Sequence, residues 1–278
     1  MTNDSLRITH YPLRITHHSS RRKWVLAGLA LVVTAIGLLA WWLWPRDDGT
    51  LAEIHRRGTL RVGLDASFPP FEAITANGQI EGLDVDIARA IAADLGVQAE
   101  LVNIGFDGLY DALLARRADV VISGLPYDPR WTQDVAYTRN YFNAGQVLVV
   151  APGSPAIAST ADLAGRTVAV EWGSQADMEA RRLAKEQPTL TLLRQPTAAD
   201  AVAALLAGQA DAAIIDAVTA QSATGLTIVT YLTDEWYAAA VHIQSRDLLN
   251  AINQSLTRLA ESGQMAKIQA RWLRPGDY

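Results

Sequence analysis

The chain has 278 residues, which is enough for two lobes of roughly 100 residues each. Half of the residues are hydrophobic and 19% are charged, a composition that excludes an intrinsically disordered chain. There is no cysteine, which excludes disulfides, thiolate catalysis and zinc–thiolate sites. Basic residues outnumber acidic ones only in the first 46 positions. The acidic remainder carries no basic stripe, so nucleic-acid binding is not expected.

An uncharged apolar run covers residues 24–44 and is about as long as the ~20 residues that cross a bilayer. Basic residues at 21–23 precede it directly, so the run predicts a transmembrane anchor with a cytoplasmic tail at 1–23. Everything after Pro45 is then expected on the extracytoplasmic face. The alternative is a cleaved signal peptide. The length of the run, its terminal tryptophans and the lack of an A-x-A site argue against it.

Residues 45–57 are predicted to form a linker that ends in a short helix, and strands and helices alternate after it. Asp84 is expected to cap the first long helix, and Gly96 follows its end. This alternation predicts an α/β fold with largely parallel sheets between helix layers. The expected strands of this half are 60–64, 99–104 and 118–123, and the expected helices are 84–95 and 106–117.

An internal repeat links the two halves of the exported part. ALLARRADVVIS at 112–123 and ALLAGQADAAII at 204–215 have the same helix–turn–strand pattern. The first strand ends at Gly124 and the second at Asp216. Ligands bind at the carboxyl ends of strands in open α/β sheets, so these two residues are expected on opposite walls of one cleft. Two unrelated helix–strand units that look alike are the alternative.

The second half predicts a second lobe at 151–234, and the first lobe then comprises 58–150 plus 235–278. Crossings near 150 and near 234 would form a hinge. The expected elements of the second lobe are strands at 167–170, 190–195 and 211–216 and helices at 174–187 and 198–208.

The run from Gly58 to Arg130, with the aromatic loop at 68–71, resembles the first lobe of extracytoplasmic solute-binding proteins of the polar amino-acid type. These proteins form bacterial solute-binding protein family 3 and feed ABC importers. The resemblance continues to the C-terminus. It implies a two-lobed type II periplasmic-binding fold, each lobe a mostly parallel sheet flanked by helices.

Two charged residues match the ends of a free amino acid. Arg130 is expected to clamp the ligand carboxylate, because a guanidinium pairs with a carboxylate through two hydrogen bonds. The resemblance supports this role, since the family has an arginine after its Gly124-type turn. Asp216 ends an apolar strand and is expected to pair with the ammonium, as in related receptors. The alternatives are an exposed arginine at a helix start and an aspartate that caps the next helix.

Other positions complete the predicted pocket. Phe68 and Phe106 are expected to sandwich the ligand side chain, although either could belong to the core. Asp65 ends the first strand and could hydrogen-bond the ligand side chain. The turn that contains Glu171, Ser174 and Gln175 opens a helix whose N–H groups suit a carboxylate; Ser174 could equally be its N-cap.

Pro126 departs from the resemblance. The family turn Gly-x-Thr-x-Thr-x-x-Arg is one residue shorter here, and Pro126 stands where a threonine N–H normally binds the carboxylate. Asp65 and Glu171 would remain as spare acids after Arg130 and Asp216 neutralise the ligand. These acids favour a neutral polar or basic ligand.

The predicted function is therefore a membrane-anchored solute receptor that passes its ligand to the permease of an ABC importer. We expect a monomer with no cofactor and no metal. The alternatives are a sensor ectodomain that works with a separate signalling protein, and a dehydratase on the same fold that uses Asp177 or Glu171 as general acid.

Overall fold

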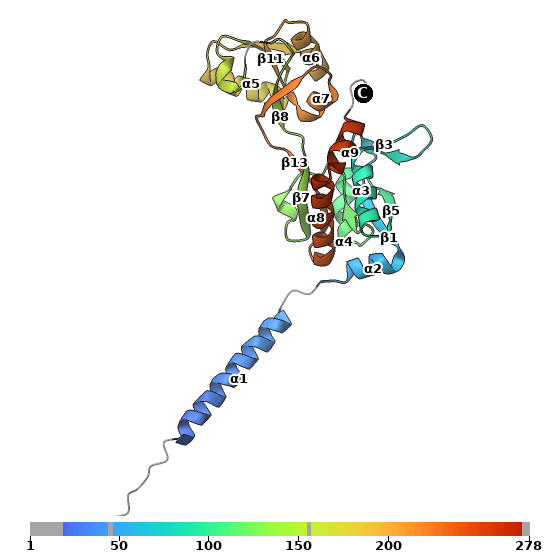
Figure 1. Ribbon diagram of the computed structural model, residues 1–278, viewed down its shortest axis with the longest axis vertical. Helices are drawn as coiled ribbons and strands as arrows, with labels where there is room; N and C mark the ends of the chain where they lie inside the picture. Colours follow the sequence, from blue (N-terminus) through green and yellow to red (C-terminus); the bar gives the residue numbers. More distant parts are fainter. Residues whose placement is uncertain (1–18, 44–46, 155–156, 274–278) are drawn as a thin grey trace, which may run out of the picture. The chain divides into compact units, whose positions relative to one another are not determined.

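The computed structural model describes residues 19–43, 47–154 and 157–273 (Figure 1). Contacts divide the chain into two compact units, Met1–Arg46 and Asp47–Tyr278, which are considered separately. Most of the predicted cytoplasmic tail at 1–23 lies outside the described residues, as do the first two residues of the predicted linker.

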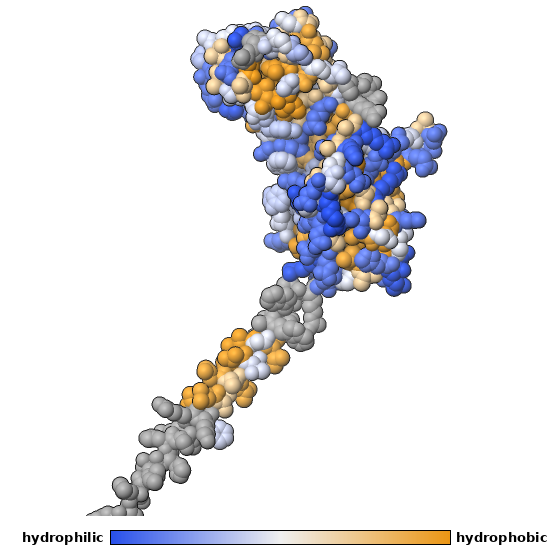
Figure 2. Space-filling model, viewed as in Figure 1, coloured by the Kyte–Doolittle hydropathy of each residue, from blue (hydrophilic) through white to orange (hydrophobic). Residues whose placement is uncertain are grey.

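The first unit contains one helix, α1 (Ser19–Leu43), within its described part. Its side chains from Trp24 to Leu38 are exposed, and Figure 2 shows apolar side chains along this stretch. Among the described residues, no helix is found that is both long and apolar enough to span a membrane. The anchor at 24–44 thus stays a prediction.

The first lobe contains a five-stranded sheet in the order β5-β1-β6-β13-β7 and a small antiparallel sheet, β2-β3-β4. Its helices are α2 (Thr50–Arg57), α3 (Leu83–Asp94), η1 (Phe106–Gly108), α4 (Leu109–Leu114), η2 (Pro129–Trp131), α8 (Arg246–Glu261) and α9 (Gln264–Trp272). Its strands are β1 (Thr59–Leu64), β2 (Ser67–Phe68), β3 (Glu72–Ile74), β4 (Ile80–Glu81), β5 (Gln98–Asn103), β6 (Val120–Val121), β7 (Val135–Asn143) and β13 (Trp236–His242).

Strand alternation divides the core of this lobe between the two faces of the five-stranded sheet. On one face, side chains such as Val62 and Val120 pack against α2, α3, α8 and α9. On the other face, Val121 and Ala240 pack against α4. Successive side chains of a strand point to opposite faces, so β6 supplies both cores.

The second lobe contains a five-stranded sheet in the order β10-β9-β11-β8-β12, with α5 on one face and α6 and α7 on the other. Its helices are η3 (Thr160–Leu163), α5 (Gln175–Glu186), α6 (Ala198–Leu206) and α7 (Ala217–Ser222). Its strands are β8 (Gln146–Val150), β9 (Thr167–Glu171), β10 (Thr191–Gln195), β11 (Ala212–Asp216) and β12 (Thr227–Tyr231).

The mixed α/β two-sheet fold agrees with the expected fold class, but the sheets are not mostly parallel. The pairs β1–β5, β1–β6, β9–β10 and β9–β11 are parallel, whereas β7–β13, β6–β13, β8–β11 and β8–β12 are antiparallel. The reason is the double crossing between the sheets. The strands that leave and return run in opposite directions, so they pair antiparallel.

The first crossing lies earlier than the predicted boundary at 150. Strand β7 ends in the first sheet at Asn143 and β8 begins in the second sheet at Gln146. The return crossing lies between Tyr231, the end of β12, and Trp236, the start of β13.

The repeated Ala-Asp turn performs the same task in both lobes. The carboxylate of Asp119 accepts the backbone N–H of Arg61 at 2.8 Å, and that of Asp211 accepts the N–H of Thr167 at 2.8 Å. Arg61 and Thr167 lie in the corresponding strands β1 and β9. The sequence repeat therefore corresponds to one structural unit used twice.

The linker is tied to the first lobe through two acidic side chains. The carboxylate of Asp48 lies 2.5 Å from the Arg116 guanidinium and accepts a hydrogen bond from Ser245 Oγ at 2.7 Å. Asp47 Oδ1 accepts the backbone N–H of Asp247 at 2.8 Å. These bonds fix the start of the second unit beside α4 and the start of α8.

Candidate functional site

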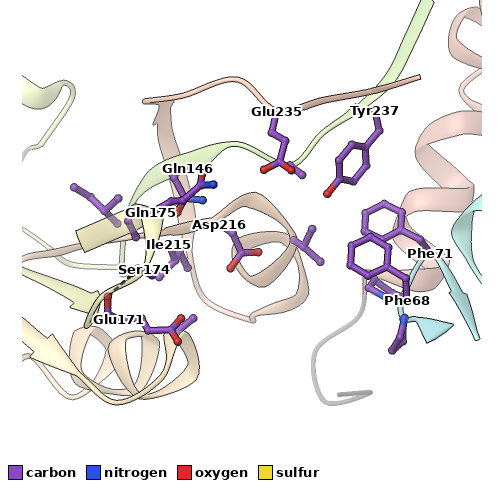
Figure 3. Close-up of a pocket in the computed structure, with 17 residues that line it drawn as sticks. Phe68, Phe71, Gln146, Glu171, Ser174, Gln175, Ile215, Asp216, Glu235 and Tyr237 are labelled. Carbon is purple, nitrogen blue, oxygen red and sulfur yellow. Dashed lines mark hydrogen bonds between the residues drawn. The ribbon is translucent and has the colours of Figure 1, made fainter. Parts of the chain in front are cut away.

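A cavity of about 390 Å³ is lined by both lobes and by the crossing segments, a volume within the range of small-molecule sites. Figure 3 shows aromatic rings on one side and acidic and amide groups on the other. The polar and aromatic residues that line it are Phe68, Phe71, Gln146, Glu171, Ser174, Gln175, Asp216, Glu235 and Tyr237.

The aromatic wall is built on a buried stack. The Phe68 ring lies on the Phe71 ring, with centroids 5.2 Å apart and planes 12° apart. Phe71 is fully buried and meets the edge of Tyr237, whereas Phe68 is 42% exposed. Phe71 therefore supports the ring that Phe68 presents to the cavity.

The Phe68 ring packs against the backbone of Gly124, where there is no space for a side chain. A Cβ at this position would lie 2.7 Å from Phe68 Cε1, and the backbone φ of +49° is one that side chains rarely adopt. The first-lobe repeat thus ends in a residue that contributes backbone and space to the wall, but no side chain.

A buried pair of acids lies beneath this wall. Glu72 Oε1 accepts a hydrogen bond from Ser123 Oγ at 2.6 Å. Asp84 Oδ2 accepts from the Gly124 N–H at 2.5 Å and from the Tyr141 hydroxyl at 2.8 Å. Both acids are fully buried. Their other oxygens, Glu72 Oε2 and Asp84 Oδ1, have no hydrogen-bond partner among the described residues.

Two buried acids without a cation cannot both ionise, so this pair holds a proton. Burial, and then the charge of Asp84, raise the pKa of Glu72 far above its usual range. Burial also raises the pKa of Asp84, although the hydrogen bonds from Gly124 and Tyr141 oppose that rise. Glu72 is therefore the neutral member at neutral pH.

The prediction that Asp84 caps a helix is wrong. Helix α3 begins at Leu83 after Gly82, and no side chain caps it. Asp84 instead turns into the core, where hydrogen bonds from the Gly124 N–H and the Tyr141 hydroxyl compensate its burial. An acid directly after the apolar loop at 68–71 was the signal for this pair, but the sequence does not show that it faces Asp84.

The second lobe supplies the polar wall. Asp216 ends β11 and caps α7, accepting the N–H of Thr219 at 2.8 Å and its hydroxyl at 2.7 Å. Ser174 caps α5, accepting the Asp177 N–H at 3.2 Å, and Gln175 is the first residue of that helix. The capping roles weighed from the sequence are thus present, and the same residues also line the cavity.

Asp177 is not suited to be the general acid of the dehydratase alternative, for which Asp177 or Glu171 was considered. Its buried carboxylate pairs with Arg181 and, at 3.1 Å, with Arg194. Burial alone would raise its pKa, but hydrogen bonds from Arg181, the Gly173 N–H and Arg194 hold it at about 2. Asp177 is therefore an anion at neutral pH with no proton to donate.

Three predicted ligand residues line a different cavity, of about 500 Å³, on the first lobe: Phe106, Pro126 and Arg130. The Arg130 guanidinium contacts Asp128 at 2.6 Å and is 85% exposed. The structure therefore does not bring Arg130 into the cavity that Asp216 lines.

Asp65 is engaged locally. Its carboxylate accepts the N–H of Phe106 at 2.8 Å and the hydroxyl of Ser67 at 2.7 Å. These bonds hold the loop after β1 against the start of η1. Asp65 thus orders the loop beside Phe68.

The cavity wall is acidic. Glu171, Asp216 and Glu235 line it, and among the described residues no lysine, arginine or histidine does. The sequence analysis missed Glu235, Tyr237 and Gln146, all of which lie at the two crossings. The returning segment EWYAAAVHI was the available signal, because it carries an acid and two aromatic residues to the hinge.

Comparisons with known proteins agree with this architecture. A family model described as bacterial extracellular solute-binding proteins, family 3, matches residues 60–275. The chain is 30% identical over 227 residues to the L-arginine-binding protein of Pseudomonas aeruginosa, covering 77% of this chain and 87% of the relative. It is 28% identical over 233 residues to the L-cystine-binding protein TcyJ of Escherichia coli, covering 81% and 86%.

Solved structures show the same fold. An ancestral cationic amino acid solute-binding protein, AncCDT-1, is 32% identical with a TM-score of 0.61, covering 81% of this chain and 100% of that one. Substrate-binding domain 2 of Lactococcus lactis GlnP in its open conformation gives a TM-score of 0.65 over 77% of this chain and 95% of that one. At 24% identity, the second likeness concerns the fold alone.

Proposed function

Because the chain belongs to the bacterial extracellular solute-binding proteins of family 3, we propose that it is a receptor for an amino acid with a neutral polar or basic side chain, which it delivers to an ABC importer. Relatives named as arginine-binding and cystine-binding proteins support the ligand class. The proposed action is closure of the two lobes about the crossings at 144–145 and 232–235.

One observation carries the proposal: a cavity that joins an aromatic wall to an acidic wall across the two crossings. An amino acid carries an ammonium and an apolar stem, and burial of its charge without a partner would cost several kcal/mol. The exposed face of Phe68 suits the stem, and Asp216 suits the ammonium.

The carboxylate grip is proposed at two places. The N–H groups at the start of α5, beside Ser174 and Gln175, can receive an anion directly. Arg130 would first have to leave Asp128, so we propose that it joins the ligand only when the lobes close. Glu171 then faces the ligand from the same turn as Ser174.

The proposed location follows the sequence prediction. Residues 24–44 would anchor the receptor, and the two lobes would work as a monomer on the extracytoplasmic face. An anchor would keep the receptor at high effective concentration beside its permease. No second candidate function is favoured by an observation of the site.

The substitution Asp216→Asn tests the proposal, because asparagine caps helices about as well as aspartate but lacks the charge. Calorimetric titration of the purified full-length chain with the proteinogenic amino acids should identify a ligand for the wild type. Asp216→Asn should then weaken binding by about tenfold or more with little change in unfolding temperature. Asp200→Asn, an exposed change on the same lobe, is the control. Equal affinity in wild type and Asp216→Asn would refute the role of Asp216, and no binding by the wild type would refute the receptor.

A further inference from the structure

Glu235 lies on the return crossing, where its backbone is held from both sides. Its N–H donates to Asn143 Oδ1 at 3.0 Å, and its carbonyl accepts the N–H of Ala144 at 2.8 Å. Both partners belong to the other crossing. The two crossings therefore fix the position of Glu235 beside the cavity.

The Glu235 side chain extends into the cavity from this position. Figure 3 shows it reaching toward the space between Asp216 and Tyr237. The side chain is half-buried, and no hydrogen bond or ion pair to its carboxylate is found among the described residues. It differs in this from Asp216, both of whose oxygens bind Thr219.

Glu235 is a half-buried carboxylate without a described partner, in a cavity with two other acids and no described basic side chain, so it is available to pair with a cation of the ligand. A neutral zwitterion brings one ammonium, which Asp216 takes in the proposed function, and leaves Glu235 unpaired. A ligand with a second positive charge on its side chain would pair both acids. The energetic gain on binding is thus largest for such a ligand.

We propose that Glu235 selects ligands with a cationic side chain, a guanidinium or a terminal ammonium, by pairing with that group. This inference rests on the proposed function and goes beyond it by naming the residue that discriminates charge. Glu171 is the competing candidate, but it lies on the second-lobe turn next to the exposed Trp172. Glu235, by contrast, lies on the return crossing, where the bonds to Asn143 and Ala144 hold its backbone.

The test uses pairs of probes that share shape but not charge. The full-length chain is titrated with L-arginine and its neutral isostere L-citrulline, and with L-lysine and its neutral isostere L-6-hydroxynorleucine. The wild type should bind the cationic member of each pair about tenfold or more tightly. Glu235→Gln should remove most of that preference by weakening the cationic probes while the neutral probes bind as before.

Three variants separate selection from folding. Glu235→Asp keeps the charge and should keep the preference, which preserves the test if Glu235→Gln unfolds. Asp234→Asn removes the adjacent charge, which faces a different cavity and accepts from Asn143 Nδ2, and should leave the preference intact. Glu171→Gln tests the competing candidate: it should leave the preference for cationic probes intact if Glu235 is the residue that pairs with the cation.

The outcomes are distinguishable. An unchanged preference in Glu235→Gln, an equal loss of both members of each pair, or a loss only in Glu171→Gln would overturn the inference and leave the receptor in place. No binding of any amino acid by the wild type would overturn the proposed function and the inference together.

Discussion

In each lobe a glycine N–H of a loop beside the cavity donates a hydrogen bond to a buried aspartate, but the two aspartates have different neighbours. In the first lobe the Gly124 N–H donates to the buried Asp84 at 2.5 Å, and in the second the Gly173 N–H donates to the buried Asp177 at 3.0 Å. Both glycines lie in loops that border the cavity. One geometric task, fixing a loop amide, thus recurs in both lobes.

The difference lies in the neighbours of the two aspartates. Asp84 faces the protonated Glu72 and has no described cation, whereas Asp177 pairs with Arg181 and Arg194. Stability that depends on a proton held by Glu72 falls as pH rises above the usual pKa of that acid, whereas a guanidinium keeps its charge over the same range. The same hydrogen bond from a loop amide should therefore respond differently to pH in the two lobes, because the two acceptor aspartates are stabilised by different neighbours.

The largest expected effect is a difference in stability between valine substitutions at Gly124 and at Gly173. Gly124→Val places a side chain against the Phe68 ring and strains the backbone, which should lower the free energy of unfolding by about 3 kcal/mol or more. Gly173→Val has similar strain, with φ +79°, but open space around the new Cβ, so it should cost only about 1–2 kcal/mol. Urea unfolding of both variants measures the gap, and equal losses would show that the Phe68 contact is unimportant.

The second effect is the alkaline sensitivity of the first lobe. The folded protein keeps a proton on the acid pair that the unfolded chain loses above the usual pKa of Glu72, so stability should fall as pH rises. The slope for one proton is about 1.4 kcal/mol per pH unit until the raised pKa is reached. Glu72→Gln mimics the protonated side chain and should flatten this slope between pH 5 and 8 in urea unfolding. Parallel pH curves for wild type and variant would mean that the pair holds no extra proton.

The third effect concerns the second lobe at acid pH. The lowered pKa of Asp177, at about 2, means that its stabilising effect is complete above its usual pKa near 3.8 and is lost as pH falls toward 2. Asp177→Asn should therefore lower the free energy of unfolding by about 2 kcal/mol at pH 6 and by much less near pH 2. A loss of stability that does not vary with pH would contradict the ion-paired state.

The smallest effect is expected at the pair of Arg130 and Asp128, in which the guanidinium is exposed and the carboxylate is partly covered. Asp128→Asn keeps the cap on η2 and leaves the guanidinium in solvent, so the change in stability should be small. The change frees the guanidinium, and it should tighten ligand binding if Arg130 is the carboxylate clamp. Arg130→Ala should then weaken binding in the same titration. Unchanged affinity in both variants would remove Arg130 from the site.

Local patterns predicted part of the secondary structure. The six strands predicted from the sequence appear with shifts of one or two residues, and Gly96 follows the end of α3 as expected, whereas no range was predicted for β2, β3, β4, β7, β8 or β12. The prediction of mostly parallel sheets failed because strand direction at the crossings depends on the path of the whole chain. No local pattern reports that path.

Part of the cavity lining was predictable from the ends of elements. Of the residues predicted to bind the ligand, Phe68, Glu171, Ser174, Gln175 and Asp216 line the cavity. Arg130 has a partner two residues away in Asp128, and Asp84 has one twelve residues away in Glu72. Competition by such neighbours decides which charged groups stay free for a ligand, and spacing alone does not show it.

The bonds of Asp47 and Asp48 have a mechanical consequence. They join the incoming chain to Arg116, Ser245 and the start of α8, all in the first lobe. Asp47 and Asp48 therefore move together with the first lobe, and in the proposed closure the second lobe moves relative to both. A pair of labels, one beside Asp47 and one on the second lobe, should therefore change its distance at each closing event, whereas a pair beside Asp47 and on the first lobe should keep a constant distance.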